Sequence, residues 1–323
     1  MQTPAAKKIV ILGTGGTIAG TSADPLDNTS YRAAQLGILE LLGTVPCLQA
    51  AFAAYAIEAE QVAQIDSKDM RHAVWLRLAQ RAAHWLADPS VHGIVVTHGT
   101  DTLEETAYFL HAVLAPVKPV VLTCAMRPAS SLMPDGPQNL LDALVTATHP
   151  GACGVLAVCA GQVHDAHQVR KLHPYRLDAF GSGEAGPLAV VEDGRLRLLH
   201  AWPAPAKPRR TPWAAMSSPW PRVEIVLSHA GADGAIVRAL LNSGEGPCVL
   251  RGLVVAGTGN GTVHEDLEAA LLEAQRCGVR VRRSTRCAEG QVLPTSADRI
   301  PDAGGLSPVK ARIALMLELL EGC

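Results

Sequence analysis

The chain has 323 residues, a formal net charge of -2 with its histidines neutral, and 18% charged residues. At about 150 residues per domain, that length predicts two domains, each large enough to bury its own core. The balanced charge lacks the basic footprint that binding to nucleic-acid phosphates needs, so we expect no nucleic-acid partner.

Residues 1–20, MQTPAAKKIVILGTGGTIAG, contain a short apolar run after two lysines. The run lacks the long apolar region and the small-residue cleavage site of a secretory signal, so it predicts a first buried strand. The apolar stretch 113–125 is interrupted by Pro116, Lys118 and Pro119, so it falls short of the roughly 18 residues that a membrane-spanning helix needs. We therefore expect a soluble protein without a membrane partner.

The first 201 residues alternate short runs rich in Val, Ile and Leu with longer amphipathic segments. This alternation predicts strands that are buried on both faces and joined by helices, which is typical of a parallel sheet. The predicted strands are residues 8–12, 51–57, 93–97, 119–123 and 154–159. The predicted helices begin near Asp69, Asp101 and Gln138.

The segment 202–222 carries six prolines, which fix the backbone and remove hydrogen-bond donors, so it predicts a linker. Beyond it the alternation resumes on a smaller scale. The predicted strands are residues 223–227, 250–255 and 279–282, and the predicted helices begin after Asp233, after His264 and at Ser307. The sequence thus predicts an α/β fold. A larger N-terminal domain (1–201) has a mostly parallel sheet flanked by helices, and a smaller C-terminal α/β domain (223–323) has a parallel sheet of its own.

The eight cysteines are scattered, with no C-x-x-C pair and no histidine partner at zinc-finger spacing. Some lie in apolar runs, as Cys159 does in GVLAVCA, where a thiol behaves as a small hydrophobic side chain. This pattern predicts a reduced, cytoplasmic protein with no bound metal.

Ligands of open parallel sheets bind beyond the carboxyl ends of the strands, which directs attention to the loops after Leu12, Ile57, Thr97 and Val255. The first loop, GTGGTIAG (13–20), differs from both glycine-rich nucleotide motifs, because Ile18 replaces a glycine and Thr21 replaces a lysine. Its glycines still present backbone amides that suit an oxyanion. Thr17 lies in the middle of this turn, where it either serves chemistry or caps the turn.

The loop THGTDTLEE (97–105) offers Thr100 and Asp101 directly after a predicted strand. Either residue could cap the following helix, with Glu104 completing a capping box. The loop IDSKDM (65–70) again places a hydroxyl and carboxylates beside a helix start. Three strand ends that bring hydroxyls and carboxylates to one crevice are harder to explain by capping alone, so we predict a site there.

Seven segments, in order, are similar to those of the bacterial L-asparaginases, and the match runs through nearly the whole chain. They are TGGTIAG (14–20), IDSKDM (65–70), VVTHGTDTLEETAYFL (95–110), AMRP (125–128), DGPQNL (135–140), GTGNG (257–261) and LSPVKAR (306–312). The resemblance, closer to cytoplasmic than to secreted members, implies an amidohydrolase that converts L-asparagine to L-aspartate and ammonia through a threonine acyl-enzyme. It also implies no cofactor, and a dimer or homotetramer with sites between subunits.

The resemblance assigns roles to individual residues. Thr17 corresponds to the nucleophile, Tyr31 to a lid tyrosine bonded to it, and Ser67 to a serine that binds the substrate carboxylate. The remaining positions that match the family's site are Thr100, Asp101 and Lys171 as catalytic residues, Gly16 and Gly99 as substrate-binding residues, and Asn260 as a contribution from the neighbouring subunit.

Elementary chemistry agrees with these roles. A threonine hydroxyl needs a proton acceptor within hydrogen-bond reach, for which Tyr31 and Lys171 are candidates. Lys171 can accept a proton only if desolvation or a neighbouring charge keeps a neutral fraction, so we hypothesise that it is desolvated beside Thr100 and has a lowered pKa. Asp101 suits the α-ammonium of the substrate, and the Thr100 amide suits an oxyanion.

Two positions depart from the secreted members. Lys68 stands where those members often carry a glutamine, and it would repel an ammonium unless Asp66 and Asp69 neutralise it. Glu289 is only a weak match for the glutamate that secreted members supply to the neighbouring subunit.

Other interpretations stay open at this stage. The polar segment 21–32 is either a mobile lid or a plain surface loop. The activity is that of an asparaginase, of a broader glutaminase-asparaginase, or of an amidotransferase subunit, although the last usually carries further domains. An amino-acid sensor without catalysis is also possible, but the complete set of Thr17, Thr100 and Lys171 argues against it.

Overall fold

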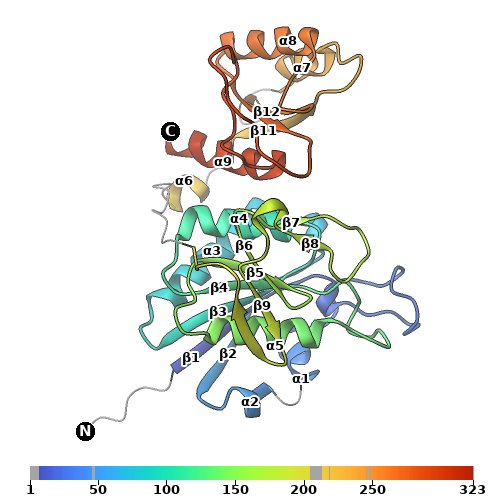
Figure 1. Ribbon diagram of the computed structural model, residues 1–323, viewed down its shortest axis with the longest axis vertical. Helices are drawn as coiled ribbons and strands as arrows, with labels where there is room; N and C mark the ends of the chain where they lie inside the picture. Colours follow the sequence, from blue (N-terminus) through green and yellow to red (C-terminus); the bar gives the residue numbers. More distant parts are fainter. Residues whose placement is uncertain are drawn as a thin grey trace. The chain divides into compact units, whose positions relative to one another are not determined.

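The computed structural model describes residues 7–45, 48–203, 213–217, 219–244, 246 and 249–322. The chain divides into two compact units, Met1–Pro208 (unit 1) and Arg209–Cys323 (unit 2). The division falls inside the segment that the prolines predict as a linker, of which residues 204–212 and 218 lie outside the described residues. Each unit has its own sheet and its own hydrophobic core (Figure 1).

Unit 1 is built on an eight-stranded sheet with the order β10-β9-β6-β5-β4-β3-β1-β2. The five parallel strands are β1 (Lys7–Gly15), β2 (Tyr55–Ile65), β3 (Val91–Thr97), β4 (Val120–Thr123) and β5 (Val155–Cys159). An antiparallel extension follows, formed by β6 (Gln162–Asp165), β9 (Ala189–Glu192) and β10 (Arg195–Leu198). A separate ribbon pairs β7 (Arg170–Lys171) with β8 (Phe180–Gly181).

Helices cover both faces of this sheet, as Figure 1 shows. One face carries α1 (Ile38–Gly43), α2 (Leu48–Ala51) and α5 (Gly136–Thr148), whose apolar side chains share a core with β1, β3 and β4. The other face carries α3 (His72–Ala87) and α4 (Leu103–Leu114). Because both faces are covered, residues such as Ile9, Val95 and Val121 are fully buried, which explains the continuous apolar runs of the central strands.

Unit 2 has a three-stranded parallel sheet with the order β11-β12-β13. Its strands are β11 (Arg222–Leu227), β12 (Leu250–Gly257) and β13 (Arg280–Thr285). Helices α7 (Ala235–Leu241) and α8 (Glu265–Arg276) share a core with one face of the sheet. Helix α9 (Pro308–Glu321) packs on the other face, where Leu315 lies against Gly252.

The predicted α/β class, with a larger mostly parallel sheet and a smaller parallel one, is confirmed. The second predicted strand (51–57) was misplaced. Helix α2 ends at residue 51, residues 52–54 form a turn, and β2 begins at Tyr55 and runs on to Ile65. The helix expected near Asp69 begins at His72, after a short 3-10 turn over Ser67–Asp69. The short helix α6 (Trp213–Ser217) lies inside the predicted linker. Within the described ranges, no helix has the length and apolar character needed to cross a membrane.

Candidate active site

Three adjacent parallel strands, β3, β1 and β2, end at the same edge of the unit 1 sheet. Strand β1 leads into a 3-10 turn that carries Thr17, and β2 leads into the turn that carries Ser67. Strand β3 leads into the loop with Thr100 and Asp101. Since β2 ends at Ile65 and not at residue 57, Ser67 directly follows its strand end, as the other two loops do.

Two glycines allow these loops to pack against one another. A Cβ atom placed on Gly16 would lie 2.3 Å from the Cα atom of Gly99, and one placed on Gly99 would lie 2.5 Å from the Oγ atom of Ser67. Gly16 also has a φ of 85°, which favours glycine, and its amide donates to the carbonyl of Ile65 at 2.9 Å. The predicted glycines are therefore the contact points between the three loops, and Thr17 and Thr100 follow them directly in the chain.

Thr17 is 6% exposed and its hydroxyl lies 2.6 Å from the phenol oxygen of Tyr31. Tyr31 belongs to the segment 21–32, which we call the lid segment. Its ends are closed by paired backbone hydrogen bonds between Thr21 and Arg32. The predicted pair of Thr17 and Tyr31 is thus brought together, and Thr17 does not cap its turn, because the residue that precedes the turn is Gly16.

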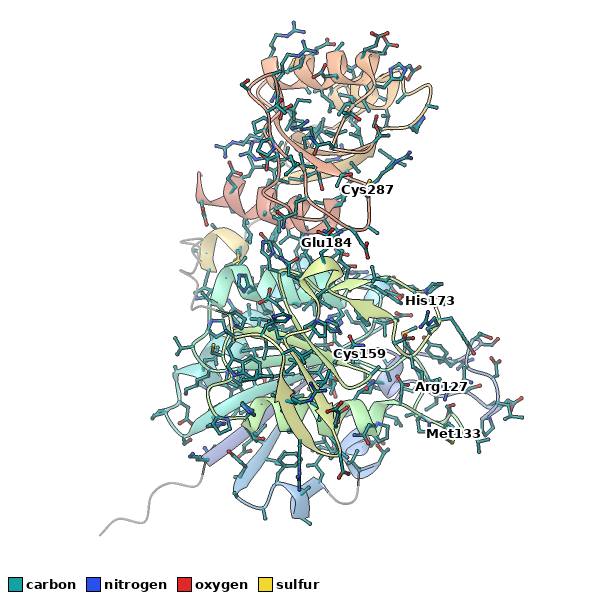
Figure 2. All side chains as sticks on the ribbon, in the orientation of Figure 1. Arg127, Met133, Cys159, His173, Glu184 and Cys287 are labelled. Carbon is teal, nitrogen blue, oxygen red and sulfur yellow. The ribbon has the colours of Figure 1, made fainter. Side chains whose placement is uncertain are left out.

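The lid segment is held by the loop that follows β4. The amide of Leu132 donates to the carbonyl of Pro25 at 2.9 Å, and the amide of Ser22 donates to the hydroxyl of Ser130 at 2.7 Å. Arg127 and Met133 of the same loop lie beside the lid segment in Figure 2, and the Arg127 guanidinium donates to the Met133 carbonyl at 3.0 Å. The two bonds at Ser22 and Pro25 therefore attach the lid segment to this loop.

Thr100, Asp101, Lys171 and Ser67 form a second connected set. The Lys171 ammonium donates to the Thr100 hydroxyl at 2.9 Å and pairs with the Asp101 carboxylate at 2.6 Å. The Asp101 amide donates to the Ser67 hydroxyl at 3.1 Å. The Lys171 side chain is 17% exposed and that of Asp101 is 51% exposed, so the lysine is the more desolvated partner, while the carboxylate faces outward.

The capping alternative for this loop is wrong. Helix α4 begins after Thr102, whose side chain does not cap it, and Glu104 completes no capping box. The Glu104 carboxylate instead accepts a hydrogen bond from the Lys171 amide at 3.2 Å, which fixes the short strand β7 beside the loop. The Thr100 and Asp101 side chains therefore do not cap the helix and can serve the site. Glu104, which the sequence pattern assigned to a helix end, instead contacts the site residue Lys171.

Two family models match the chain. The model described as "Asparaginase, N-terminal" matches residues 8–204, and the model described as "Glutaminase/Asparaginase C-terminal domain" matches residues 222–322. The chain belongs to the asparaginase family. L-asparaginase 2 of Escherichia coli is 36% identical, with 97% of this chain and 89% of that protein covered. A glutaminase-asparaginase of Pseudomonas fluorescens is 35% identical, with 96% and 86% covered.

Solved structures agree with this membership. The crystal structure of a probable cytoplasmic L-asparaginase from Campylobacter jejuni superimposes with a TM-score of 0.89 at 36% identity. It covers 97% of this chain, and this chain covers 95% of it. The predicted recognition of the asparaginase family is confirmed over both units.

This asparaginase-family site contains a buried histidine that the sequence reasoning left out. His98 is fully buried between Thr97 and Gly99, and its Nδ1 atom lies 2.7 Å from the Gly99 carbonyl oxygen. Its Nε2 atom lies 2.9 Å from the Thr106 hydroxyl, which also accepts a bond from the Trp75 indole. Burial lowers the pKa of His98 to about 4, so the ring is neutral at pH 7. The sequence contains the pattern T-H-G-T, but this pattern does not indicate that the imidazole ring of His98 points into the core.

The positive charge of Lys68, beside the asparaginase-family site, is compensated by neighbouring carboxylates. Its ammonium pairs with the Asp66 carboxylate and lies 3.6 Å from that of Asp69, and its side chain is 61% exposed. The hydrogen bond that the Lys68 ammonium donates to the Asp66 carboxylate raises the pKa of Lys68. The two flanking aspartates therefore compensate its charge, as the sequence suggested. Within the described ranges, no cluster of three or more His, Cys, Asp or Glu side chains is placed to hold a metal ion.

Asn260 lies in unit 2, in the loop that follows β12. Its side-chain amide donates to the Leu293 carbonyl at 2.9 Å and accepts from the Leu293 amide at 2.7 Å. Glu289 lies on the exposed loop after β13. The contact of Asn260 with the site of a neighbouring subunit stays a prediction from the asparaginase-family resemblance.

Proposed function

We propose that this chain is an L-asparaginase that hydrolyses L-asparagine to L-aspartate and ammonia through an acyl-enzyme on Thr17. The observation that carries the proposal is the contact between Gly16 and Gly99, which brings the two threonine loops together at one sheet edge. Membership of the asparaginase family over both units supports the same reaction.

The polar groups suit the three parts of asparagine. The Asp101 carboxylate is half-exposed and accepts the α-ammonium through a charge-assisted hydrogen bond. The Ser67 hydroxyl already accepts a bond from the Asp101 amide, so its own proton is directed to the α-carboxylate. With both ends of the amino acid held, the side-chain amide is positioned at Thr17, where the amide of Thr100 stabilises the oxyanion.

The reaction proceeds in two steps. The Thr17 oxygen attacks the side-chain amide carbon, the C–N bond breaks, and the hydroxyl proton ends on the departing nitrogen as ammonia. Tyr31 is the described side chain that hydrogen-bonds to the Thr17 hydroxyl, so it relays this proton. Water then attacks the ester, which releases aspartate and returns a proton to Thr17. The Lys171 ammonium bonds to Thr100 and Asp101, so Lys171 acts on the reaction through these two residues.

Ammonia release from L-asparagine tests the proposal. Thr17→Ala removes the nucleophile and is expected to lower kcat by about a thousandfold or more, whereas Thr17→Ser keeps a hydroxyl and retains measurable turnover. Acyl-enzyme formation is read by mass spectrometry of acid-quenched enzyme, with an adduct on the peptide that holds Thr17. Full activity of Thr17→Ala would exclude the mechanism, and binding of asparagine without turnover by the unmodified chain would favour the sensor.

A broader glutaminase-asparaginase activity is the second candidate, because a relative with that name is 35% identical. Glutamine has one further methylene group, which is worth only about 1–3 kcal/mol in a pocket. The values of kcat/KM for the two amides decide between the candidates: a ratio above about a hundred defines an asparaginase, and a ratio near ten or below defines the broader enzyme.

We further propose a homo-oligomer, a dimer or a dimer of dimers, in which Asn260 reaches the site of a neighbouring subunit, and a cytoplasmic location. The Campylobacter jejuni relative is named a probable cytoplasmic enzyme, which supports the location, whereas a relative from Haemophilus influenzae is named a probable periplasmic one. Light scattering of the purified chain tests the assembly, and fractionation of the source cells tests the location.

A further inference from the structure

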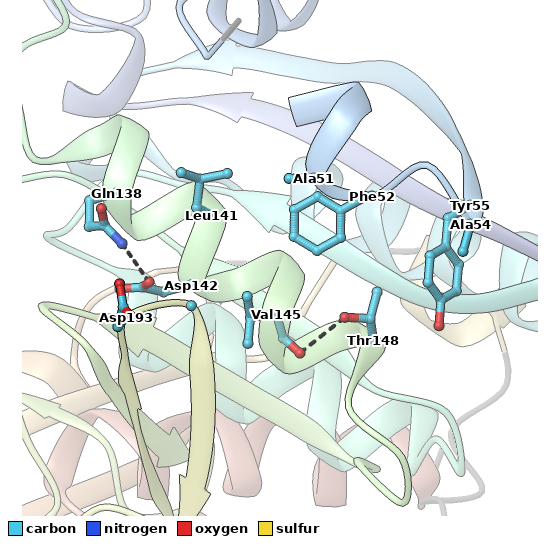
Figure 3. Close-up of a pocket in the computed structure, with 11 residues that line it drawn as sticks. Ala51, Phe52, Ala54, Tyr55, Gln138, Leu141, Asp142, Val145, Thr148 and Asp193 are labelled. Carbon is cyan, nitrogen blue, oxygen red and sulfur yellow. Dashed lines mark hydrogen bonds between the residues drawn. The ribbon is translucent and has the colours of Figure 1, made fainter. Parts of the chain in front are cut away.

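A cavity of about 620 Å³ lies in unit 1 among α2, α5 and the turn between β9 and β10 (Figure 3). Its apolar wall is formed by Phe52, Leu141 and Val145. Its polar groups include Asp142 and Asp193, which Figure 3 draws at the same end of the cavity, and Tyr55, which it draws at the other end. The cavity shares no residue with the site of Thr17 and Thr100.

Asp142 is the most unusual group in this cavity, because it is a carboxylic acid that is only 3% exposed. Its Oδ1 atom accepts a hydrogen bond from the Gln138 amide at 2.8 Å, one turn earlier on α5. Its Oδ2 atom receives no hydrogen bond from any residue that the structure describes. Burial raises the pKa of Asp142 although the Gln138 bond lowers it, so the ionised carboxylate is under-compensated.

Asp193 is held at the cavity by the geometry of its turn. Glu192 and Arg195 are paired across β9 and β10, so Asp193 and Gly194 form a two-residue turn. Both have positive φ, 48° and 68°, which is the arrangement of a tight hairpin turn that favours Asp-Gly. The described lining contains no lysine, arginine or histidine, so neither carboxylate meets a cation in the cavity.

We propose that this cavity binds a small organic cation, with an ammonium or amidine-like head at Asp142 and Asp193 and an apolar body against Phe52, Leu141 and Val145. A neutral ligand without a hydrogen-bond donor would leave the buried Asp142 carboxylate with the Gln138 hydrogen bond alone. A metal ion would use two carboxylates but leave the apolar wall and most of the volume unfilled. A cation that carries an apolar body matches both halves of the cavity.

Isothermal titration calorimetry of the full chain with 2-phenylethylamine, which is protonated at pH 7.5, tests the proposal. We expect saturable binding of one equivalent, at least about tenfold tighter than that of the neutral analogue 2-phenylethanol. No saturable binding, or equal binding of the two compounds, would overturn the proposal. Because Asp101 could also attract an amine, the titration is repeated with Asp101→Asn, in which binding at the cavity is expected to be unchanged.

Variants locate the site. Asp142→Asn preserves the shape and the Gln138 bond, and it is expected to weaken binding at least about tenfold, whereas the more exposed Asp193→Asn weakens it about threefold. Glu273→Gln, the same charge change on an exposed position of α8, serves as the matched control and leaves binding unchanged. Binding by Asp142→Asn that equals that of the unmodified chain would overturn the proposal.

A cavity-filling variant decides the matter if Asp142→Asn fails to fold by circular dichroism. Ala51→Trp places a large side chain into the cavity from an exposed position at the end of α2 and leaves both carboxylates intact. Loss of 2-phenylethylamine binding in this variant supports the proposal, and unchanged binding contradicts it. Since the readout is binding at a cavity separate from Thr17, its outcome is independent of whether the chain hydrolyses asparagine.

Discussion

The two units present the same kind of turn at the end of a central parallel strand, and they use it differently. Strand β1 ends within the segment Gly-Thr-Gly-Gly (13–16), and β12 ends at the first residue of Gly-Thr-Gly-Asn-Gly (257–261). In unit 1 the turn packs on two other loops through Gly16, and the Thr17 hydroxyl bonds to the lid segment. In unit 2 the turn closes on itself, with the hydroxyls of Thr258 and Thr262 2.8 Å apart.

This difference teaches how to judge a glycine-rich turn at a strand end. In unit 2 the amide of Asn260 is also used, since it makes two bonds with the backbone of Leu293. In unit 1 the Asp101 carboxylate faces outward and the Ser67 proton is left for a ligand. A turn of this kind indicates a site when its polar groups remain available, and a structural link when they satisfy one another. Substitutions in each turn can break or sharpen this distinction.

After the loss expected for Thr17→Ala, the largest effect is expected at Lys171, whose ammonium joins Thr100 to Asp101. Lys171→Met removes these bonds and is expected to lower kcat for asparagine by about a thousandfold, within the range of proton-transfer groups. Its size differs little from lysine, so circular dichroism should show a folded chain.

Lys171→Arg separates charge from proton transfer. The guanidinium keeps a positive charge beside Asp101 but cannot lose its proton, so KM should stay near that of the unmodified chain while kcat stays low. Recovery of kcat in Lys171→Arg would limit Lys171 to an electrostatic role, and a pH profile unchanged in Lys171→Met would remove it from the mechanism.

The second effect concerns acid stability and the buried ring of His98. Its pKa is lowered to about 4 in the folded chain, so the unfolded chain binds a proton more readily between pH 6.5 and 4. Stability due to this ring is complete above pH 6.5 and is lost as the pH falls toward 4, by roughly 3 kcal/mol. Urea unfolding at a series of pH values measures the loss.

His98→Gln is the comparison that isolates this ring, because the carboxylates titrate alike in both proteins. The variant cannot be protonated, so its stability should fall less between pH 7 and pH 4, and the two curves should converge at low pH. Parallel curves would show that the ring does not carry the acid dependence. The neutral ring also holds the Gly99 carbonyl, so the variant should lose some activity at pH 7.

A third effect tests the contact between the loops of unit 1. Gly99→Ala places a methyl group 2.5 Å from the Ser67 hydroxyl oxygen, so one of the loops must move. A displacement of about 1 Å in a positioned site costs roughly a hundredfold in kcat/KM. The matched control is Gly259→Ala in the unit 2 turn, where no atom would approach the new methyl group within 4 Å, although its φ of 45° adds some strain. Equal losses in the two variants would contradict the distinction between the turns.

The central elements of the fold could be predicted because their residues are apolar without interruption. Residues such as Ile9 and Val95 lie on strands that are buried on both faces, and burial leaves a signal in the sequence. The antiparallel strands β6 and β10 could not be predicted, because each has four residues and β10 is largely exposed. Strand β2 was misplaced because most of its positions are exposed or half-buried and only Val62 is buried, so it carries no continuous apolar run.

The site residues could be predicted where family motifs matched. They could be predicted less well where tertiary contacts determine the direction or the partner of a side chain. The positions of Thr17, Thr100 and Ser67 followed from their loops, but the inward direction of His98 did not. Glu104 was assigned to a capping box because its spacing fits one, yet the competing partner is the Lys171 amide, 67 positions away. Spacing along the chain cannot reveal a partner of this kind.

The smallest effect is expected at Asn260, where the two proposed roles of one side chain can be separated. Asn260→Ala removes both bonds to Leu293 and is expected to lower the free energy of unfolding by about 1–2 kcal/mol, measured in urea. Leu293→Ala keeps the backbone groups that Asn260 binds, so it serves as the control for the exposed loop. If Asn260 acts only as a link within unit 2, kcat/KM at a temperature where both variants are fully folded should fall less than about threefold. A larger fall in Asn260→Ala alone would support the proposed contact of the Asn260 amide with the site of a neighbouring subunit.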